Sequence, residues 1–81
     1  MTKNEIAGFV KQSIIEETGI DASSINQEAP LSTLGIDSLS AIVILNRIED
    51  HYHTELNPLC FWDHPTVGEF TNFLCSHLKA E

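Results

Sequence analysis

The sequence lacks the features that mark membrane, secreted and nucleic-acid-binding proteins. No apolar run approaches the roughly 18–20 residues of a membrane-spanning helix, and the apolar residues near the N-terminus are spaced rather than continuous, unlike those of a signal peptide. Basic residues are scarce, because four Lys and Arg stand against twelve Asp and Glu, a net charge of −8. Such a surface repels nucleic-acid phosphates and anionic membranes and attracts basic protein partners. We therefore expect one soluble, monomeric, cytoplasmic domain over residues 1–81 that binds neither nucleic acid nor membrane.

Cysteine is also rare, and its spacing does not favour a metal site. The two cysteines, Cys60 and Cys75, lie in apolar stretches, and the sequence has no Cys-x-x-Cys motif. Cys60 and His64 are four residues apart and His51 and His53 are two apart, but no second pair stands at zinc-finger distance. We expect two reduced thiols that face the core, and no bound metal ion.

Strand-like alternation and sequence repeats are missing, whereas helical periodicity is present. Apolar residues recur at intervals of three and four, which predicts an all-α bundle of three longer helices and one short helix. The predicted helices cover residues 3–18, 38–52, 58–63 and 67–79. The residues that we expect to cap or end them are Thr2, Gly19, Asn57 and Thr66. A long connection over residues 20–37 joins the first two helices.

Each of the three longer helices has an apolar stripe that predicts the core. The expected core residues are Ile6, Phe9, Val10, Ser13 and Ile14 in the first helix, Ala41, Ile44, Leu45, Ile48 and Tyr52 in the second, and Val67, Phe70, Phe73, Leu74, His77 and Leu78 in the last. Four apolar residues of the long connection, Ile25, Leu31, Leu34 and Ile36, are expected to hold it against this core.

The helix over residues 38–52 has a second apolar face. Leu39, Ile42 and Val43 fall between about 40° and 140° around the helix from Ser38, whereas the core stripe falls between about 240° and 340°. The polar residues Asn46, Glu49 and Asp50 share this second face. In a bundle of short helices the first turns of one helix are hard to cover completely. A small apolar patch with an acidic rim is typical of a protein-docking surface.

Ser38 opens this helix within "PLSTLGIDSLSAIVIL", and two interpretations of it compete. Serine is among the commonest N-terminal helix caps, and spacing alone favours that role. The alternative is an exposed attachment point for a covalent group. A catalytic nucleophile is not favoured, because the stretch is not G-x-S-x-G and the chain is too short to build a substrate cleft with an oxyanion hole.

Two stretches decide between these interpretations by their resemblance to a known family. "LGIDSLSAIVILNRIED" resembles the helix-opening signature of acyl carrier proteins of polyketide type, and "FWDHPTVGEFTNFL" resembles the second signature of the same family. The resemblance covers essentially the whole chain and implies the four-helix carrier fold. It implies that Ser38 receives 4′-phosphopantetheine from coenzyme A. It also implies that Asp37 helps present Ser38 and the magnesium-bound donor to a phosphopantetheinyl transferase.

The resemblance further implies a carrier without catalytic activity of its own. Acyl or polyketide intermediates would ride on the arm as thioesters to an acyltransferase, a ketosynthase or other synthase enzymes that dock on the second apolar face. Val43 departs from the family pattern, in which glutamate is frequent, and this departure favours a more apolar partner. Phe61 and Trp62 either belong to the core or line a cavity that shelters the cargo. We expect His64 to be a structural element of the turn before the last helix.

Two main rival functions stay open at this point, and a D-alanyl carrier of the same fold is a weaker option. The first is a peptidyl or aryl carrier of a nonribosomal pathway, although Ile36 stands where those carriers usually have a second glycine. The second is an unmodified helical interaction module in which Ser38 only caps its helix. The sequence names neither the cargo nor the partner enzymes, and it fits a freestanding protein and a domain of a larger synthase equally well.

Overall fold

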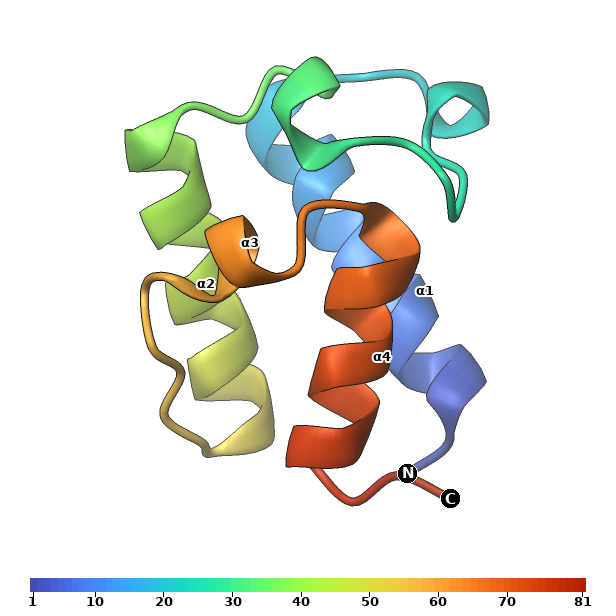
Figure 1. Cartoon of the computed structure of the whole chain (residues 1–81), viewed down its shortest axis with the longest axis vertical. Coiled ribbons are helices and arrows are strands. Elements are labelled where there is room, and N and C mark those ends of the chain that lie inside the picture. The colour runs from blue at the N-terminus through green and yellow to red at the C-terminus, as the bar shows by residue number, and fades with distance from the viewer.

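A computed structural model describes all residues, 1–81, and shows a helical bundle (Figure 1). The longer helices are α1 (Lys3–Thr18), α2 (Ser38–Tyr52) and α4 (Val67–His77), and α3 (Cys60–Asp63) is a single turn beside α2. The predicted fold class is confirmed, because three longer helices and one short helix are present and no strand is formed. The helices also lack the length and continuous apolar character that a bilayer crossing requires.

Three of the predicted helix ends are confirmed in detail. The side-chain oxygen of Thr2 accepts a hydrogen bond from the backbone N–H of Glu5, at 3.2 Å, and Thr66 accepts one from Glu69, at 3.1 Å. Gly19 ends α1 in the left-handed conformation, with φ of 73°, which glycine adopts without the steric cost that a Cβ imposes. These ends were predictable because capping depends on residues only three positions apart.

The start of α3 was predicted wrongly. The helix begins at Cys60 rather than at residue 58. The side chain of Asn57 does not cap it but accepts a hydrogen bond from the N–H of Leu59, at 2.8 Å. This local bond, two residues along the chain, closes a turn around Pro58, and the helix forms only after it.

The end of α4 was also predicted wrongly. The helix stops at His77 rather than at residue 79, because Lys79 is in the left-handed region with φ of 56°. His77 was expected in the buried stripe but is exposed. Its Nε2 lies 3.0 Å from the hydroxyl of Thr54 and 3.1 Å from the carbonyl oxygen of Glu55. The ring is thus held at the surface by polar groups of the loop that follows α2.

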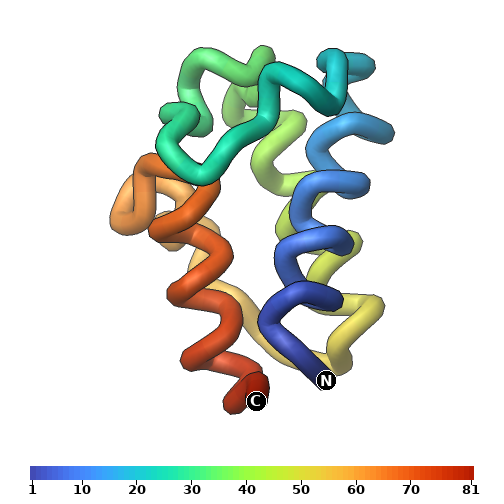
Figure 2. Tube along the Cα trace, turned by 90° about the vertical axis from the view of Figure 1, so that its right-hand side faces the viewer, coloured from blue at the N-terminus to red at the C-terminus, as the bar shows by residue number.

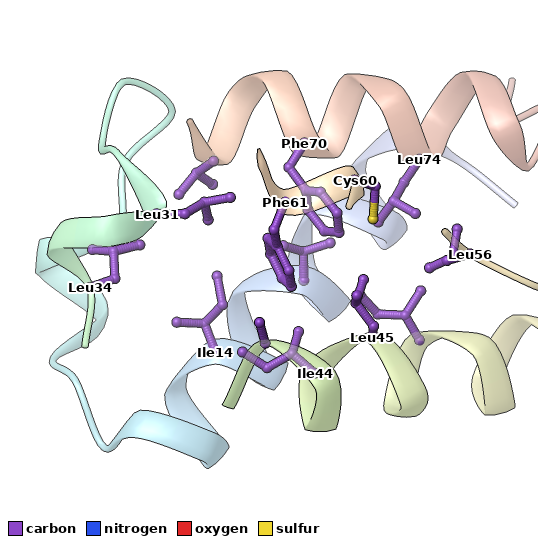
Figure 3. Packing of buried hydrophobic residues seen from close by; sticks show 14 of the residues in the cluster. Ile14, Leu31, Leu34, Ile44, Leu45, Leu56, Cys60, Phe61, Phe70 and Leu74 are labelled. Carbon is purple, nitrogen blue, oxygen red and sulfur yellow. The ribbon is translucent and has the colours of Figure 1, made fainter. Parts of the chain in front are cut away.

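One apolar core fills the space between the helices (Figure 3). Ile14, Ile44, Phe70 and Leu74 are all fully buried, and Phe61 stacks on Phe70 with ring centroids 4.4 Å apart. The predicted stripes are confirmed at their centres. Phe9, Tyr52, Phe73 and Leu78 are only half-buried at the margins. Cys75 is buried as expected, whereas the burial of Thr71 was not expected.

The long connection between α1 and α2 packs across one end of the bundle (Figure 2). Ile25, Leu31 and Leu34 are buried and Ile36 is half-buried, as predicted. The connection also contains two short 3₁₀ turns, η1 (Ala22–Ser24) and η2 (Leu31–Thr33), which were not predicted.

Backbone hydrogen bonds join this connection to the start of α4. The N–H of Val67 donates to the carbonyl of Ala29, at 3.0 Å, and the N–H of Gly68 donates to that of Gln27, at 2.8 Å. The first N–H groups of a helix have no partner inside it, so the loop supplies acceptors that α4 needs. The contact fixes the loop that leads into the start of α2.

Candidate functional site

At the start of α2, Asp37 is the capping residue. Its backbone is extended, and its Oδ1 accepts a hydrogen bond from the N–H of Ser40, at 2.8 Å. The N–H of Ala41 donates to the Asp37 carbonyl, at 2.9 Å, so Ser38 is already the first helical residue. The interpretation of Ser38 as the helix cap is therefore wrong. The cap needs extended backbone and a side chain that reaches back over the first turn, and Asp37 meets both conditions.

Ser38 itself is exposed at the N-terminal tip of α2. Its hydroxyl is left for another use, because Asp37 already performs the capping. The backbone N–H groups of Ser38 and Leu39 have no acceptor inside the helix, and the helix dipole is positive at this end. The tip of α2 therefore favours a negatively charged group bound to the Ser38 oxygen.

Hydrogen bonding favours the charged form of the Asp37 carboxylate. The bond from the backbone N–H of Ser40 lowers the pKa of Asp37 below its ordinary value, because it stabilises the ionised form. No Lys or Arg occurs between residues 12 and 46, so no basic side chain of the connection accompanies this carboxylate. The site thus offers a fixed negative charge directly beside the exposed hydroxyl.

A groove of about 390 Å³ opens beside Ser38. Its walls come from the connection (Pro30, Leu31, Ser32, Ile36), from the start of α2 (Asp37, Ser38, Ala41) and from the α3 region (Phe61, Trp62, Pro65). Phe61 is 6% exposed and belongs to the core as well, whereas Trp62 is 63% exposed. Phe61 is therefore a core residue that also lines the groove, and Trp62 lines the groove without belonging to the core. That these two residues shelter a cargo stays a prediction.

The second face of α2 is open where the sequence predicted it. Leu39 is 71% exposed and Ile42 is 49% exposed, and Val43 is half-buried. Leu59, next to α3, is another exposed apolar side chain that sequence reasoning missed, since a leucine beside a short helix is usually assigned to the core.

The polar residues of this face differ in their exposure and in their hydrogen bonding. Asn46 and Asp50 are exposed, but Glu49 is half-buried and its Oε2 accepts a hydrogen bond from the N–H of Leu56, at 2.8 Å. Glu49 therefore also holds the loop between α2 and α3. Local sequence patterns do not predict such a bond, because the two residues are seven positions apart and lie in different elements.

The cysteines and His64, which the sequence analysis also considered, are packed against other residues of the fold. Cys60 and Cys75 are buried free thiols, and burial raises the pKa of Cys60 to about 11. His64 stacks on Phe73 with ring centroids 4.4 Å apart, in the turn before α4 as expected. No three His, Cys, Asp or Glu side chains are grouped so that they could hold a metal ion.

Comparison with known families identifies the family to which the chain belongs. Residues 8–74 match the family model described as "Phosphopantetheine attachment site". The chain belongs to this family. The family description implies a phosphopantetheine group attached to the domain, and the matched residues include the exposed serine at the tip of α2.

Curated relatives of this phosphopantetheine-attachment domain are large synthases. It is 35% identical over 75 residues to the non-reducing polyketide synthase PKS16 of Cladonia grayi, which covers 90% of this chain. It is 32% identical over 81 residues, its full length, to the conidial pigment polyketide synthase PfmaE of Pestalotiopsis fici. The chain spans about 4% of the length of these two relatives.

Solved structures of carrier proteins share the fold of this phosphopantetheine-attachment domain. A free-standing peptidyl carrier protein from a secondary metabolic pathway of Acinetobacter baumannii superposes with a TM-score of 0.85 at 25% identity, covering 95% of this chain and 96% of that one. BlmI, a type-II acyl carrier protein of Streptomyces verticillus involved in bleomycin biosynthesis, gives a TM-score of 0.82 at 25% identity, covering 94% and 89%.

Proposed function

We propose that residues 1–81 form one acyl carrier domain of a polyketide-type pathway, with Ser38 as the attachment residue for 4′-phosphopantetheine. The observation that carries this proposal is the division of roles at the start of α2, where Asp37 caps the helix and Ser38 is exposed. The match to the phosphopantetheine-attachment family supports phosphopantetheine as the attached group. The polyketide synthases among the relatives support the class of cargo.

The residues around Ser38 fit a phosphopantetheine group. An exposed hydroxyl gives the arm a covalent anchor, and the N-terminal tip of α2 stabilises the negative charge of a phosphodiester. The groove beside Ser38 offers apolar surface along which an arm can lie. When bound, the group supplies a terminal thiol that holds acyl groups as thioesters.

Asp37 and Ser38 act here without any catalysis by this chain. In our proposal the carboxylate of Asp37 helps present Ser38 to a phosphopantetheinyl transferase, and Mg²⁺ enters only transiently with the coenzyme A donor. Because the transferase performs the chemistry, Ser38 needs only exposure and a fixed position. The chain is thus a carrier rather than an enzyme.

The second face of α2 is the proposed docking surface for partner enzymes such as the transferase, an acyltransferase or a ketosynthase. Its apolar contacts are Leu39, Ile42 and Val43, and its polar rim is Asn46, Glu49 and Asp50. The exposure of Leu39 and Ile42 supports this surface. Since Val43 is apolar, we expect the preferred partner to present a more apolar counterpart than a purely charge-led partner does.

Modification of the purified chain tests the proposal directly. The chain is incubated with coenzyme A, Mg²⁺ and a broad-specificity phosphopantetheinyl transferase and is then weighed by mass spectrometry. We expect the mass of one phosphopantetheine to be added to the unaltered chain and to Ser32→Ala, an exposed serine that also lines the groove. Ser38→Ala should gain nothing. An unmodified chain with a native circular dichroism spectrum would contradict the proposal.

A peptidyl carrier role is the second candidate, because the Acinetobacter peptidyl carrier shares the fold closely. The two functions differ in the enzyme that loads the arm. Transfer of an acyl group by an acyltransferase supports the first, and loading only by an amino-acid-adenylating enzyme supports the second.

A further inference from the structure

Another pocket lies where the two ends of the chain meet, at the pole of the bundle away from the start of α2 (Figure 1). Its volume of about 460 Å³ falls within the range of about 300–1,000 Å³ in which proteins bind small molecules. It is lined by the start of α1 and by the end of α4 with the residues that follow, namely Lys3, Asn72, Cys75, Ser76, Lys79 and Ala80. The proposed carrier function uses none of these residues.

Half of the Lys and Arg residues of the chain meet at this pocket, because Lys3 and Lys79 are two of only four. The one ion pair in the structure joins Arg47 to Glu16, so neither pocket lysine is paired with a carboxylate. Twelve Asp and Glu residues are present in the chain, yet the fold leaves these two ammonium groups free. They supply a local positive charge on an acidic protein.

The remaining polar groups of the pocket are also able to donate hydrogen bonds. The amide of Asn72, the hydroxyl of Ser76 and the thiol of Cys75 each offer a donor. Cys75 is only 5% exposed, and its thiol is free. No carboxylate side chain lines the pocket. This set of donors favours a ligand that is rich in acceptor oxygens and negatively charged.

The helix ends at the pocket favour the same charge. Lys3 is the first residue of α1, where free N–H groups and the helix dipole are positive. The end of α4 has the opposite sign, but two of its carbonyl groups are already occupied. The N–H of Lys79 donates to the carbonyl of Ser76, at 3.2 Å, and the N–H of Ala80 donates to that of Cys75, at 2.8 Å. The positive groups therefore dominate the pocket.

We infer that this pocket binds a small phosphorylated molecule, with Lys3 and Lys79 as its charged contacts. Phosphate is favoured over carboxylate because lysine binds phosphate as a point charge, whereas the planar fork that matches a carboxylate belongs to arginine, which the pocket lacks. Two charge-assisted hydrogen bonds correspond to a dissociation constant of about 1 mM. The site is independent of the proposed function, since it requires no group on Ser38.

Titration with pyrophosphate tests this inference directly. Sodium chloride keeps the ionic strength constant, and ¹H–¹⁵N NMR spectra are recorded as pyrophosphate is added. We expect the backbone signals of Lys3 and Ser76 and the side-chain amide signal of Asn72 to shift along one saturable curve. The signals from the start of α2 should stay in place. Citrate, which carries carboxylates only, should bind more weakly than pyrophosphate.

Substitution of the lysines identifies the residues that bind. Lys3→Gln and Lys79→Gln each remove one charge, and we expect each to weaken the affinity for pyrophosphate about tenfold. Lys11→Gln is the matched control, because Lys11 is an exposed lysine of the same helix as Lys3 but does not line the pocket. Its affinity should equal that of the unaltered chain. Circular dichroism spectra verify that all three variants are folded.

Thermal unfolding gives a second, independent readout. A ligand that binds only the folded chain raises the melting temperature, by about 5–10 °C for a domain of this size at a concentration ten times the dissociation constant. The double variant Lys3→Gln with Lys79→Gln is measured in the same buffers, so that a general effect of the salt is subtracted. We expect most of the increase to be lost in the double variant.

The possible outcomes separate this inference from the proposed function. Signals that move without saturation, or equal affinities in Lys3→Gln, Lys79→Gln and Lys11→Gln, would show unspecific attraction and overturn the site. Citrate that binds as tightly as pyrophosphate would overturn the assignment to phosphate. A chain that binds pyrophosphate but gains no phosphopantetheine would contradict the proposed function and leave this site intact.

Discussion

At the start of α2, two adjacent side chains perform different tasks. Asp37 satisfies the N–H of Ser40, and the neighbouring hydroxyl of Ser38 is thereby available for covalent chemistry. Sequence reasoning considered serine as the cap because serine and aspartate are both good caps. The choice between neighbours depends on which of them has the extended backbone, and only the structure shows that.

Replacement of Asp37 tests its capping role. Asp37→Ala should lower the melting temperature measured by circular dichroism at pH 7, whereas Asp37→Asn should retain most of it, since asparagine also caps helices. Equal destabilisation by both would show that charge rather than capping matters. Because hydrogen bonding lowers the pKa of Asp37, its stabilising effect is present at neutral pH. That effect is lost as pH falls below about 4, and Asp37→Asn should lack this component.

The Cys60 thiol offers a second test at the scale of single residues. Cys60 is 2% exposed, and burial raises its pKa to about 11, so little thiolate forms at pH 8. We expect negligible labelling by iodoacetamide in the folded chain at pH 8 and full labelling in denaturant, located by peptide mapping. Rapid labelling of Cys60 in the folded chain would contradict the buried position.

Among the elements, α4 and the connection approach each other closely at Gly68. A Cβ on Gly68 would lie 2.9 Å from the carbonyl oxygen of Gln27, which is backbone and cannot move aside easily. We expect Gly68→Ala to lower the free energy of unfolding by about 1–3 kcal/mol, measured by urea denaturation.

Gly8 provides the matched control for that experiment. It lies inside α1, and a Cβ there would meet nothing within 4 Å. Gly8→Ala should therefore stabilise the chain by about 0.5–1 kcal/mol, because alanine is the better helix former. If both substitutions were stabilising, the close approach at Gly68 would not limit the fold.

The α2 face offers a test at the same scale. Val43 is half-buried on the proposed docking surface, so a charge there should change recognition while the helix stays folded. We expect Val43→Glu to weaken the binding of the natural partner enzyme, measured by isothermal titration calorimetry, with an unchanged circular dichroism spectrum. Unchanged or tighter binding would show that Val43 lies outside the interface.

Whether a feature of the helices can be predicted from the sequence depends on how far apart the interacting residues are in the chain. Thr2 and Gly19 were predicted correctly because capping and helix termination are local. The role of Glu49, which accepts a hydrogen bond from Leu56 across a loop, was not predictable from neighbouring residues. The exposure of Trp62 also depends on how a one-turn helix docks, and composition alone assigns tryptophan to the interior.

Across the whole molecule, charge is distributed unevenly. Arg47 is the only Lys or Arg between positions 12 and 78, and it forms an ion pair with Glu16 of α1. The connection, α3 and the surroundings of Ser38 therefore have carboxylates without neighbouring lysines in the chain. Such a field steers the domain so that its acidic face meets a basic partner first.

Salt should therefore slow the modification of Ser38. Raising the ionic strength from about 0.01 M to about 0.15 M shortens the Debye length from about 30 Å to about 8 Å. We expect the transferase rate at limiting carrier concentration to fall about tenfold. Asp63→Asn, in α3 beside the groove, should weaken this dependence, and Glu81→Gln should not. A salt-independent rate would exclude electrostatic steering.

The two ends of the chain lie together at the pole of the bundle away from the start of α2 (Figure 1). The N–H of Glu81 donates to the carbonyl of Met1, at 3.3 Å. Any polypeptide or solid support joined to either end consequently departs from the rear of the domain. An anchor at either end therefore leaves the Ser38 hydroxyl and the start of α2 unobstructed.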